Sequence, residues 1–299
     1  MHTGSTPDSS TPREGFVPVD GAELYFREVG RGRPIIVLHG GPDFSHSYLL
    51  PEMDRFSDSY RLIYYDQRGR GRSGAGVEPE DVTIELEMED LDRLRRFFQL
   101  KSVAVLGHSW GGLLAMEYAI RQPRRVSHLI LLNTAPASHD DLELLRQETR
   151  KTAADLEELK ALAASASYQS GDLKADAEYY RIHFRPAFWR PEHLERVVRK
   201  LRIGMTPDGI RKARAIEDRL YAQTWSASGY DLFPALARLS VPTLIVHGDH
   251  DLIPAACAEH IAQAIPGSRF ALLRECGHFS YLERSDEVRE ALARFFDDH

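Results

Sequence analysis

A serine lies where two apolar segments meet, in the stretch LGHSWGG. The run 103–106 before it is typical of a buried strand, and the run 113–121 after it is typical of a helix. So tight a junction predicts a positive φ at Ser109, which would hold its hydroxyl exposed. Gly107 and Gly111 lie two residues on either side, where strand and helix would pass too closely for a Cβ. The pattern favours Ser109 as a nucleophile.

A serine hydroxyl needs a general base and an orienting carboxylate to attack at neutral pH. In a strand–turn–helix arrangement of this kind, the acid and then the histidine follow the serine along the chain. His278 follows the last predicted strand, in RECGHFSYLE, and is the expected base. The stretch VHGDHDLIP follows an earlier strand and offers Asp249 and Asp251 as the acid. Their spacing alone does not choose between them.

The negative charge that develops on a substrate carbonyl oxygen requires backbone N–H donors aimed at one point. Trp110 offers one donor at the start of the predicted helix, where the helix dipole also favours negative charge. The second donor is expected in HGGP, after the run 35–38. Pro42 has no N–H, so Gly41 is the candidate, and Gly40 would let the backbone approach closely.

Four potential metal ligands crowd the acid-bearing turn: His247, Asp249, His250 and Asp251. Side chains this close in one turn cannot all face one ion, and the rest of the sequence offers no matching group of ligands. We therefore expect no metal site.

The stretch GRGRSG at 69–74 matches a dinucleotide-binding pattern and follows a predicted strand. The residues after it do not open a helix, and no acid-tipped strand follows at the required distance. We therefore expect no cofactor. Arg68, Arg70 and Arg72 are expected to be loop residues held by carboxylates such as Asp66.

The elements that must position these residues alternate between strand and helix. Six short apolar runs lack clean alternation, as strands buried on both faces do; they are 35–38, 62–65, 103–106, 129–132, 244–246 and 270–273. Helical patterns fall between them, at 82–98, 113–121, 256–265 and 286–296. This rhythm predicts an α/β fold with a mostly parallel central sheet flanked by helices. An antiparallel hairpin at 16–30, turning at Asp20-Gly21, would precede the sheet.

The alternation stops between Asn133 and about Tyr230, where helix follows helix. Pro191 and Pro207 stand where a first-turn proline belongs. We predict a helical cap at 134–230 over the end of the sheet, inserted into a catalytic domain formed by 15–133 and 231–299. Residues 1–14 are polar and predict a disordered tail.

Composition excludes several classes of function. The chain has 299 residues, a net charge of −7 and a pI near 6.0, which provide no basic face for nucleic acid. No apolar run is long enough to span a membrane, and the N-terminus lacks the pattern of a secretion signal. Cys257 and Cys276 are too few for a disulfide framework. We expect a cytoplasmic protein that binds a small molecule or short peptide; the oligomeric state cannot be predicted.

Together these residues resemble the α/β-hydrolase superfamily over essentially the whole chain after the tail. Within it, HGGPDFSHSYLLP, YDQRGRGRSG and GHSWGG are similar to the proline iminopeptidase family. The resemblance places the acid at the second aspartate of a G-x-x-D turn, which is Asp251 here. It also implies the roles given above to Ser109, His278, Gly41 and Trp110.

The resemblance is weaker where the substrate is selected. Family members that remove an N-terminal proline hold its amine with carboxylates on cap helices, but a W-x-x-W-E element found in one branch is missing here. Glu217 and Asp218 are the acids that could bind the amine, or they could lie on a solvated helix face. Phe188, Trp189, Tyr221 and Trp225 are candidate pocket walls or, at helical spacing, residues of the core; Trp225 is also a candidate substrate-binding residue.

The expected function is that of a cofactor-free serine hydrolase that releases an N-terminal proline or another small residue. A carboxylesterase or lactonase with a neutral acyl pocket is the alternative, since the fold is shared by many activities. A non-catalytic ligand receptor on the same fold is a more remote one. Epoxide hydrolases and haloalkane dehalogenases are disfavoured, because they use an aspartate where this chain has Ser109.

Overall fold

The computed structural model of the chain describes residues 11–227 and 229–298. Within them, eight strands form one sheet in the order β1-β2-β4-β3-β5-β6-β7-β8. The strands are β1 (Arg13–Val19), β2 (Ala22–Val29), β3 (Arg33–Leu38), β4 (Tyr60–Tyr65), β5 (Val103–His108), β6 (Val126–Leu132), β7 (Thr243–Gly248) and β8 (Arg269–Leu273). Pairing is antiparallel for β1–β2 and β2–β4 and parallel from β4 to β8. The predicted fold class is confirmed.

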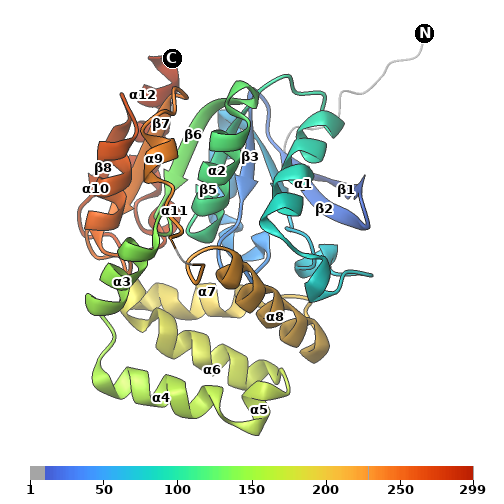
Figure 1. Cartoon of the computed structure of the whole chain (residues 1–299), viewed down its shortest axis with the longest axis vertical. Helices are drawn as coiled ribbons and strands as arrows, with labels where there is room; N and C mark the ends of the chain where they lie inside the picture. Colours follow the sequence, from blue (N-terminus) through green and yellow to red (C-terminus); the bar gives the residue numbers. More distant parts are fainter. Residues whose placement is uncertain (1–10, 228, 299) are drawn as a thin grey trace.

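Helices cover both faces of this sheet (Figure 1). They are α1 (Ile84–Phe97), α2 (Trp110–Arg121), α9 (Phe233–Leu236), α10 (Ala255–Ala264), α11 (Ser280–Glu283) and α12 (Ser285–Asp297). Along β3, Ile36 and Leu38 join the apolar cluster that contains α1, α2 and α10. Ile35 and Val37 join the cluster that contains α12. The strand is thus buried on both sides, which explains why its sequence is continuously apolar.

Six further helices lie between β6 and β7 along the chain. They are α3 (His139–Gln147), α4 (Ala153–Ala163), α5 (Ala166–Gln169), α6 (Leu173–Phe184), α7 (Leu194–Leu201) and α8 (Pro207–Gln223). Pro207 opens α8 behind the N-cap Thr206, and Pro191 opens a short 3₁₀-helix, both as predicted. In Figure 1 these helices gather at one end of the sheet. We propose that residues 134–230 act as the cap.

The N-terminal boundary differs from the expected one. Residues 1–10 of the predicted tail lie outside the described residues, but β1 already begins at Arg13. The Arg13 guanidinium pairs with Glu28 at 3.3 Å and lies over the rings of Phe26 and Phe98. These contacts hold Arg13 and Glu14 in the hairpin, so assigning 13–14 to a tail was wrong.

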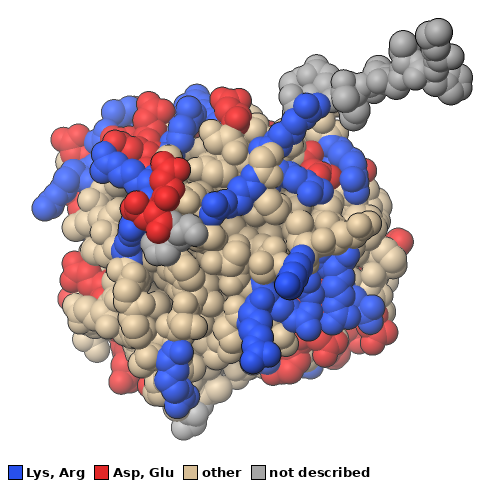
Figure 2. Space-filling model, turned by 90° about the horizontal axis from the view of Figure 1, so that it is seen from above, with Lys and Arg blue, Asp and Glu red and all other residues tan. Residues whose placement is uncertain are grey.

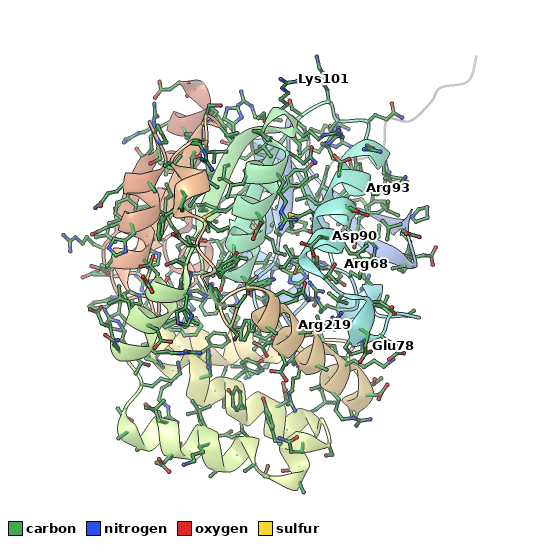
Figure 3. The ribbon with its side chains drawn as sticks, in the orientation of Figure 1. Arg68, Glu78, Asp90, Arg93, Lys101 and Arg219 are labelled. Carbon is green, nitrogen blue, oxygen red and sulfur yellow. The ribbon has the colours of Figure 1, made fainter. Side chains whose placement is uncertain are left out.

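The arginines of the GRGRSG region are held by carboxylates, as predicted, but Asp66, the example named, binds the backbone N–H of Arg72 and pairs with none of the three guanidinium groups. Each arginine pairs with a different acid: Arg68 with Asp90 at 2.6 Å, Arg70 with Glu87 at 2.6 Å and Arg72 with Glu14 at 3.2 Å. Figure 3 shows Arg68 beside Asp90 of α1. Asp66 instead accepts hydrogen bonds from the ring and backbone N–H of His46 and from the backbone N–H of Arg72. The segment is a packed loop.

On the face shown in Figure 2, basic and acidic side chains lie beside one another around a largely uncharged central area. In the part of the chain that is described, no helix combines the length and apolarity needed to cross a bilayer. Cys257 and Cys276 are both buried and unpaired. No group of three or more potential metal ligands comes together among the described residues.

Candidate active site

Ser109 lies at the predicted sharp turn between β5 and α2. Its backbone adopts φ 55° and ψ −122°, so the predicted positive φ is confirmed. A Cβ on Gly107 would lie 2.2 Å from the carbonyl oxygen of Gly111, and one on Gly111 would lie 2.2 Å from that of Leu38. The turn therefore accepts only glycine at both positions, and it leaves the Ser109 side chain on the wall of a cavity.

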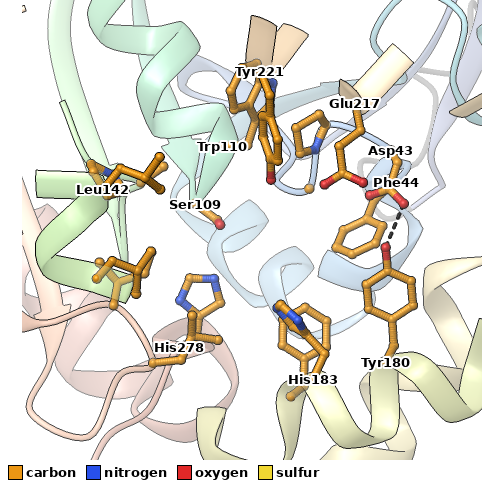
Figure 4. Close-up of a pocket in the computed structure, with 18 of the residues that line it drawn as sticks. Asp43, Phe44, Ser109, Trp110, Leu142, Tyr180, His183, Glu217, Tyr221 and His278 are labelled. Atoms are coloured by element: carbon orange, nitrogen blue, oxygen red, sulfur yellow. Dashed lines mark hydrogen bonds between the residues drawn. The ribbon is translucent and has the colours of Figure 1, made fainter. Parts of the chain in front are cut away.

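His278 and Asp251 meet at the same end of the sheet. The Nδ1 atom of His278 donates to Oδ1 of Asp251 at 2.8 Å, and both side chains are buried. Burial alone would raise the pKa of Asp251, but the neighbouring charges of His278 and His247 and its hydrogen bonds lower it to about 2. The carboxylate is therefore ionised at every pH at which the His278 imidazole could act as a general base. In Figure 4 the side chains of Ser109 and His278 both face the cavity, and His278 is the nearer of the two labelled histidines to Ser109.

Asn133 fixes the orientation of this acid, and the sequence analysis missed it. Its Nδ2 group donates to Oδ2 of Asp251 at 2.8 Å and to the carbonyl of Gly277 at 3.0 Å. Its Oδ1 atom accepts from the hydroxyl of Ser280 at 2.6 Å. Asn133 directly follows β6 and has φ 47°. An asparagine at the end of a predicted strand is a residue type that tolerates a positive φ, and this could have drawn attention to it. The sequence does not reveal its contact with Asp251, which lies 118 residues further along the chain.

A hydrogen-bond chain beneath Ser109 joins the loop after β3 to His278. The Gly40 N–H donates to the Tyr48 hydroxyl at 2.7 Å, and that hydroxyl lies 2.7 Å from Nδ1 of His108. The other ring nitrogen of His108 lies 2.9 Å from the carbonyl oxygen of His278. Because a carbonyl only accepts, His108 carries its proton on Nε2 and accepts from Tyr48 on Nδ1. The ring is therefore neutral.

The expected oxyanion donors flank Ser109. Trp110 is the first residue of α2, and Gly41 has φ 50°; both line the cavity with Ser109. A Cβ on Gly40 would lie 2.8 Å from the Cβ of Ser109, so the loop after β3 passes as closely as predicted. The Gly40 N–H is already used by Tyr48, which leaves Gly41 as the donor candidate on this loop.

The cavity above Ser109 has a volume of about 490 Å³, a size suited to a small-molecule ligand. Its walls come from the loop after β3, the start of α2 and helices α3, α4, α6 and α8. Figure 4 shows Glu217 and Asp43 on one side of Ser109 and Leu142 on the other. The cavity therefore has a carboxylate-bearing end and an apolar end.

Asp43 and Glu217 make the carboxylate-bearing end, and Asp43 was not predicted. Asp43 is buried, and its Oδ2 accepts from Tyr180 at 2.7 Å and from Arg202 at 2.5 Å. Its Oδ1 has no hydrogen-bond partner among the described residues. Burial and then the nearby charge of Asp43 raise the pKa of Glu217 well above its usual range, although a hydrogen bond with Tyr221 opposes this.

The other predicted pocket residues divide between the cavity and the surroundings. Tyr221 and Trp225 line the cavity, and the Trp225 indole N–H donates to the carbonyl of Pro136 at 3.0 Å. Asp218 is exposed and does not line it, because successive residues on a helix face different directions. Phe188 is instead stacked on Phe279, and Trp189 is 44% exposed; both fall outside the lining set, so placing them in the walls was wrong.

Two buried neutral histidines near the site predict acid lability. Burial is the main cause that lowers the pKa of His39 and of His108 from 6.5 to about 3. Between those values the unfolded chain binds protons that the folded chain does not, so the free energy of unfolding falls as pH decreases from about 6.5 to about 3. Each ring contributes about 1.4 kcal/mol per pH unit. Urea unfolding between pH 7 and pH 4 measures this slope.

His108→Gln separates the contribution of one ring. At pH 5 we expect the slope of the unfolding free energy against pH to be smaller than in the native chain by the contribution of one proton, about 1.4 kcal/mol per pH unit. The slope is the readout because the lost hydrogen bonds lower stability at every pH. A slope that stays unchanged in this variant would contradict the neutral assignment of His108.

The comparisons with known proteins agree with this geometry. Residues 33–285 match the family model described as the alpha/beta hydrolase fold. The chain is 31% identical to a proline iminopeptidase of Lactobacillus crispatus, over 96% of this chain and 98% of that one. The crystal structure of a proline iminopeptidase from Mycobacterium smegmatis superposes with a TM-score of 0.71 at 23% identity, covering 96% and 98% of the two chains. An esterase from Exiguobacterium antarcticum gives 0.69 at 25% identity, covering 96% and 98%.

The fold and the serine turn thus define a hydrolase of the α/β class. The chain belongs to the α/β-hydrolase fold family, and within it to the proline iminopeptidase-like proteins. The resemblance predicted from the sequence motifs is confirmed.

Proposed function

We propose that the protein is a serine aminopeptidase that releases an N-terminal proline or another small residue from a short peptide. The observation that carries this proposal is Glu217, a half-buried carboxylate on the cavity wall beside Asp43. A peptide with a free N-terminus brings a cationic amine, whereas a simple ester brings none. The chain's similarity to named proline iminopeptidases supports the same activity.

The charges around Glu217 explain why it would bind a cation. Arg202 pairs with Asp43 and with Asp176, and Arg214 pairs with Asp176 as well. Two arginines and two aspartates thus balance each other, and among the described residues Glu217 forms no ion pair, in keeping with its raised pKa. A buried carboxylate is costly without a positive partner. A substrate ammonium would supply that partner and would stabilise the ionised form of Glu217.

In the acylation step, the Nε2 atom of His278 takes the proton of Ser109 while Oγ bonds to the scissile carbonyl carbon. The carbonyl π electrons move to oxygen, where the N–H groups of Gly41 and Trp110 stabilise the negative charge. The intermediate collapses, the C–N bond breaks, and His278 returns the proton to the leaving amine. Asp251 holds the imidazole in the required tautomer and stabilises its cationic form.

In the deacylation step, a water molecule takes the place of the leaving amine. His278 removes one proton as the water oxygen bonds to the acyl carbon, and the same N–H groups hold the second oxyanion. The ester bond to Ser109 then breaks, and the proton returns to Oγ. The released amino acid frees Glu217 for the next amine.

Replacing Glu217 tests the proposed amine site. For Glu217→Gln we expect kcat/KM on proline p-nitroanilide to fall about 10- to 100-fold, because a charged hydrogen bond is lost. Turnover of p-nitrophenyl butyrate, which has no amine, should stay within about 2-fold. Steady-state kinetics on the two substrates measure both values.

Asp218→Asn is the matched control, since this neighbouring carboxylate is exposed and outside the cavity lining. It should leave both substrates unaffected. Ester turnover by the native chain without any anilide cleavage would contradict the aminopeptidase proposal and support an esterase. An equal effect of Glu217→Gln on both substrates would contradict the amine site.

A further inference from the structure

Lys151, which forms no ion pair with any described residue, lies on the wall of the same cavity. Lys151 belongs to the connection between α3 and α4, and its side chain is half-buried. Among the described residues no carboxylate forms an ion pair with it. The acid with the strongest electrostatic influence is Asp155, whose own oxygens bind the Thr152 hydroxyl and backbone N–H and the Arg185 guanidinium.

The ammonium of Lys151 is only partly solvated. Burial lowers the pKa of Lys151, and the charge of Asp155 opposes that shift without cancelling it. Lys151 lines the cavity together with His183 and Ser109. Its charge contributes, after burial, to lowering the pKa of the His183 ring. A partly desolvated cation on a cavity wall is stabilised when a ligand places an anionic group beside it.

Lys151 and Glu217 belong to different parts of the cavity. Asp43 and Tyr221 act on Glu217, whereas Asp155 acts on Lys151. Lys151 follows Arg150, whose guanidinium donates to the carbonyl of Asp249 in the turn after β7. Leu142 of the preceding helix α3 lies on the opposite side of Ser109 from Glu217 in Figure 4. Four leucines, Leu142, Leu145, Leu156 and Leu159, line this part of the cavity together with Arg146 and Thr149. Unlike Lys151, Arg146 is already paired with a carboxylate, that of Glu143. A peptide held by its amine at Glu217 therefore extends past Ser109 into an apolar region that ends in a cation.

We propose that Lys151 binds the C-terminal carboxylate of the leaving residue, so that the preferred substrates are dipeptides with an apolar second residue. This inference rests on the proposed function, which sets the direction of the substrate. An extended dipeptide spans about 7 Å, and the four-carbon stem of lysine can adjust to its end. The carboxylate of a dipeptide would balance Lys151 as its amine balances Glu217.

The test compares prolyl-leucine with prolyl-leucinamide, which differ only in the charge at the C-terminus. We expect the native chain to cleave the free acid with a kcat/KM about 10- to 100-fold higher than the amide. Lys151→Met should lower the value for the free acid by the same factor and leave the amide within about 2-fold. Chromatographic detection of released proline measures all four reactions.

Lys160→Met is the matched control, since Lys160 is exposed on α4. It should keep the native preference, and cleavage of the amide by Lys151→Met shows that this variant is folded. Equal cleavage of acid and amide by the native chain, or a Lys151→Met effect on both alike, overturns the assignment of Lys151 while leaving the proposed aminopeptidase intact. Cleavage of proline p-nitroanilide but of neither peptide overturns only the dipeptide preference, whereas cleavage of neither the peptides nor any aminoacyl p-nitroanilide overturns both.

Discussion

Ser109→Ala is expected to lower kcat on proline p-nitroanilide by about 10⁴- to 10⁶-fold, because the acyl-enzyme can no longer form. The loss should extend to p-nitrophenyl butyrate, since both substrates would use the same oxygen. Alanine suffers the same steric cost as serine at φ 55°, so the turn itself should persist. Steady-state kinetics, with circular dichroism to check the fold, measure the effect.

Ser226→Ala provides the matched control for this variant. Ser226 also lines the cavity, but it follows α8 and lies in the chain far from the β5–α2 turn. We expect its turnover to stay within about 2-fold of the native value. A fluorophosphonate should label the native chain and the Ser226 variant but not the Ser109 variant. Unchanged turnover after Ser109→Ala would remove the serine mechanism for every substrate tested.

The sheet and the serine turn were predictable because their constraints are local. Strands buried on two faces leave continuous apolar runs, and β3 to β7 each contain one. The edge strand β8 also contains an apolar run, although its residues are only partly buried. The glycines around Ser109 are required by backbone contacts of 2.2 Å, so their spacing is visible in the sequence. Such features can be predicted from the sequence without knowing how distant segments of the chain pack.

The substrate-facing side chains were not predictable to the same degree, since they depend on how the cap helices dock. Glu217 and Asp218 are adjacent on α8, yet one lines the cavity and the other is exposed. A helix places successive side chains about 100° apart, so one acid faces inward only after the helix is positioned. Lys151 was missed for the same reason. Asp43 follows the predicted donor Gly41 by two residues, but its role depends on Tyr180 and Arg202 of the cap, which the local sequence does not reveal.

The choice between Asp249 and Asp251 depended on the resemblance alone, and the structure adds a physical distinction. Asp251 is buried and accepts from His278 at 2.8 Å. Asp249 accepts the backbone N–H of Cys276 at 3.3 Å and lies 3.6 Å from Arg274 at the surface. The turn after β7 thus directs the two carboxylates to different surroundings, and the sequence shows only that both are present.

Asp251→Asn should lower kcat on proline p-nitroanilide by about 10⁴-fold with little change in fold, whereas Asp249→Asn should change it by less than about 3-fold. The carboxylate accepts from Ile253 N–H and His278 on Oδ1 and from Asn133 on Oδ2. An amide offers one oxygen for these three donors. If that oxygen faces His278, the amide N–H₂ opposes the N–H₂ of Asn133.

If the amide instead turns its N–H₂ toward His278, the ring must accept on Nδ1 and carry its proton on Nε2, which prevents it from taking the proton of Ser109. Either orientation therefore fails, one by a donor–donor contact and the other by the wrong tautomer. A pH–rate profile distinguishes the loss of the general base from a disrupted fold. If only the general base is lost, activity should recover partly at alkaline pH, where hydroxide can take its place. Comparable losses in the Asp249 and Asp251 variants would contradict the assignment of Asp251 as the orienting acid.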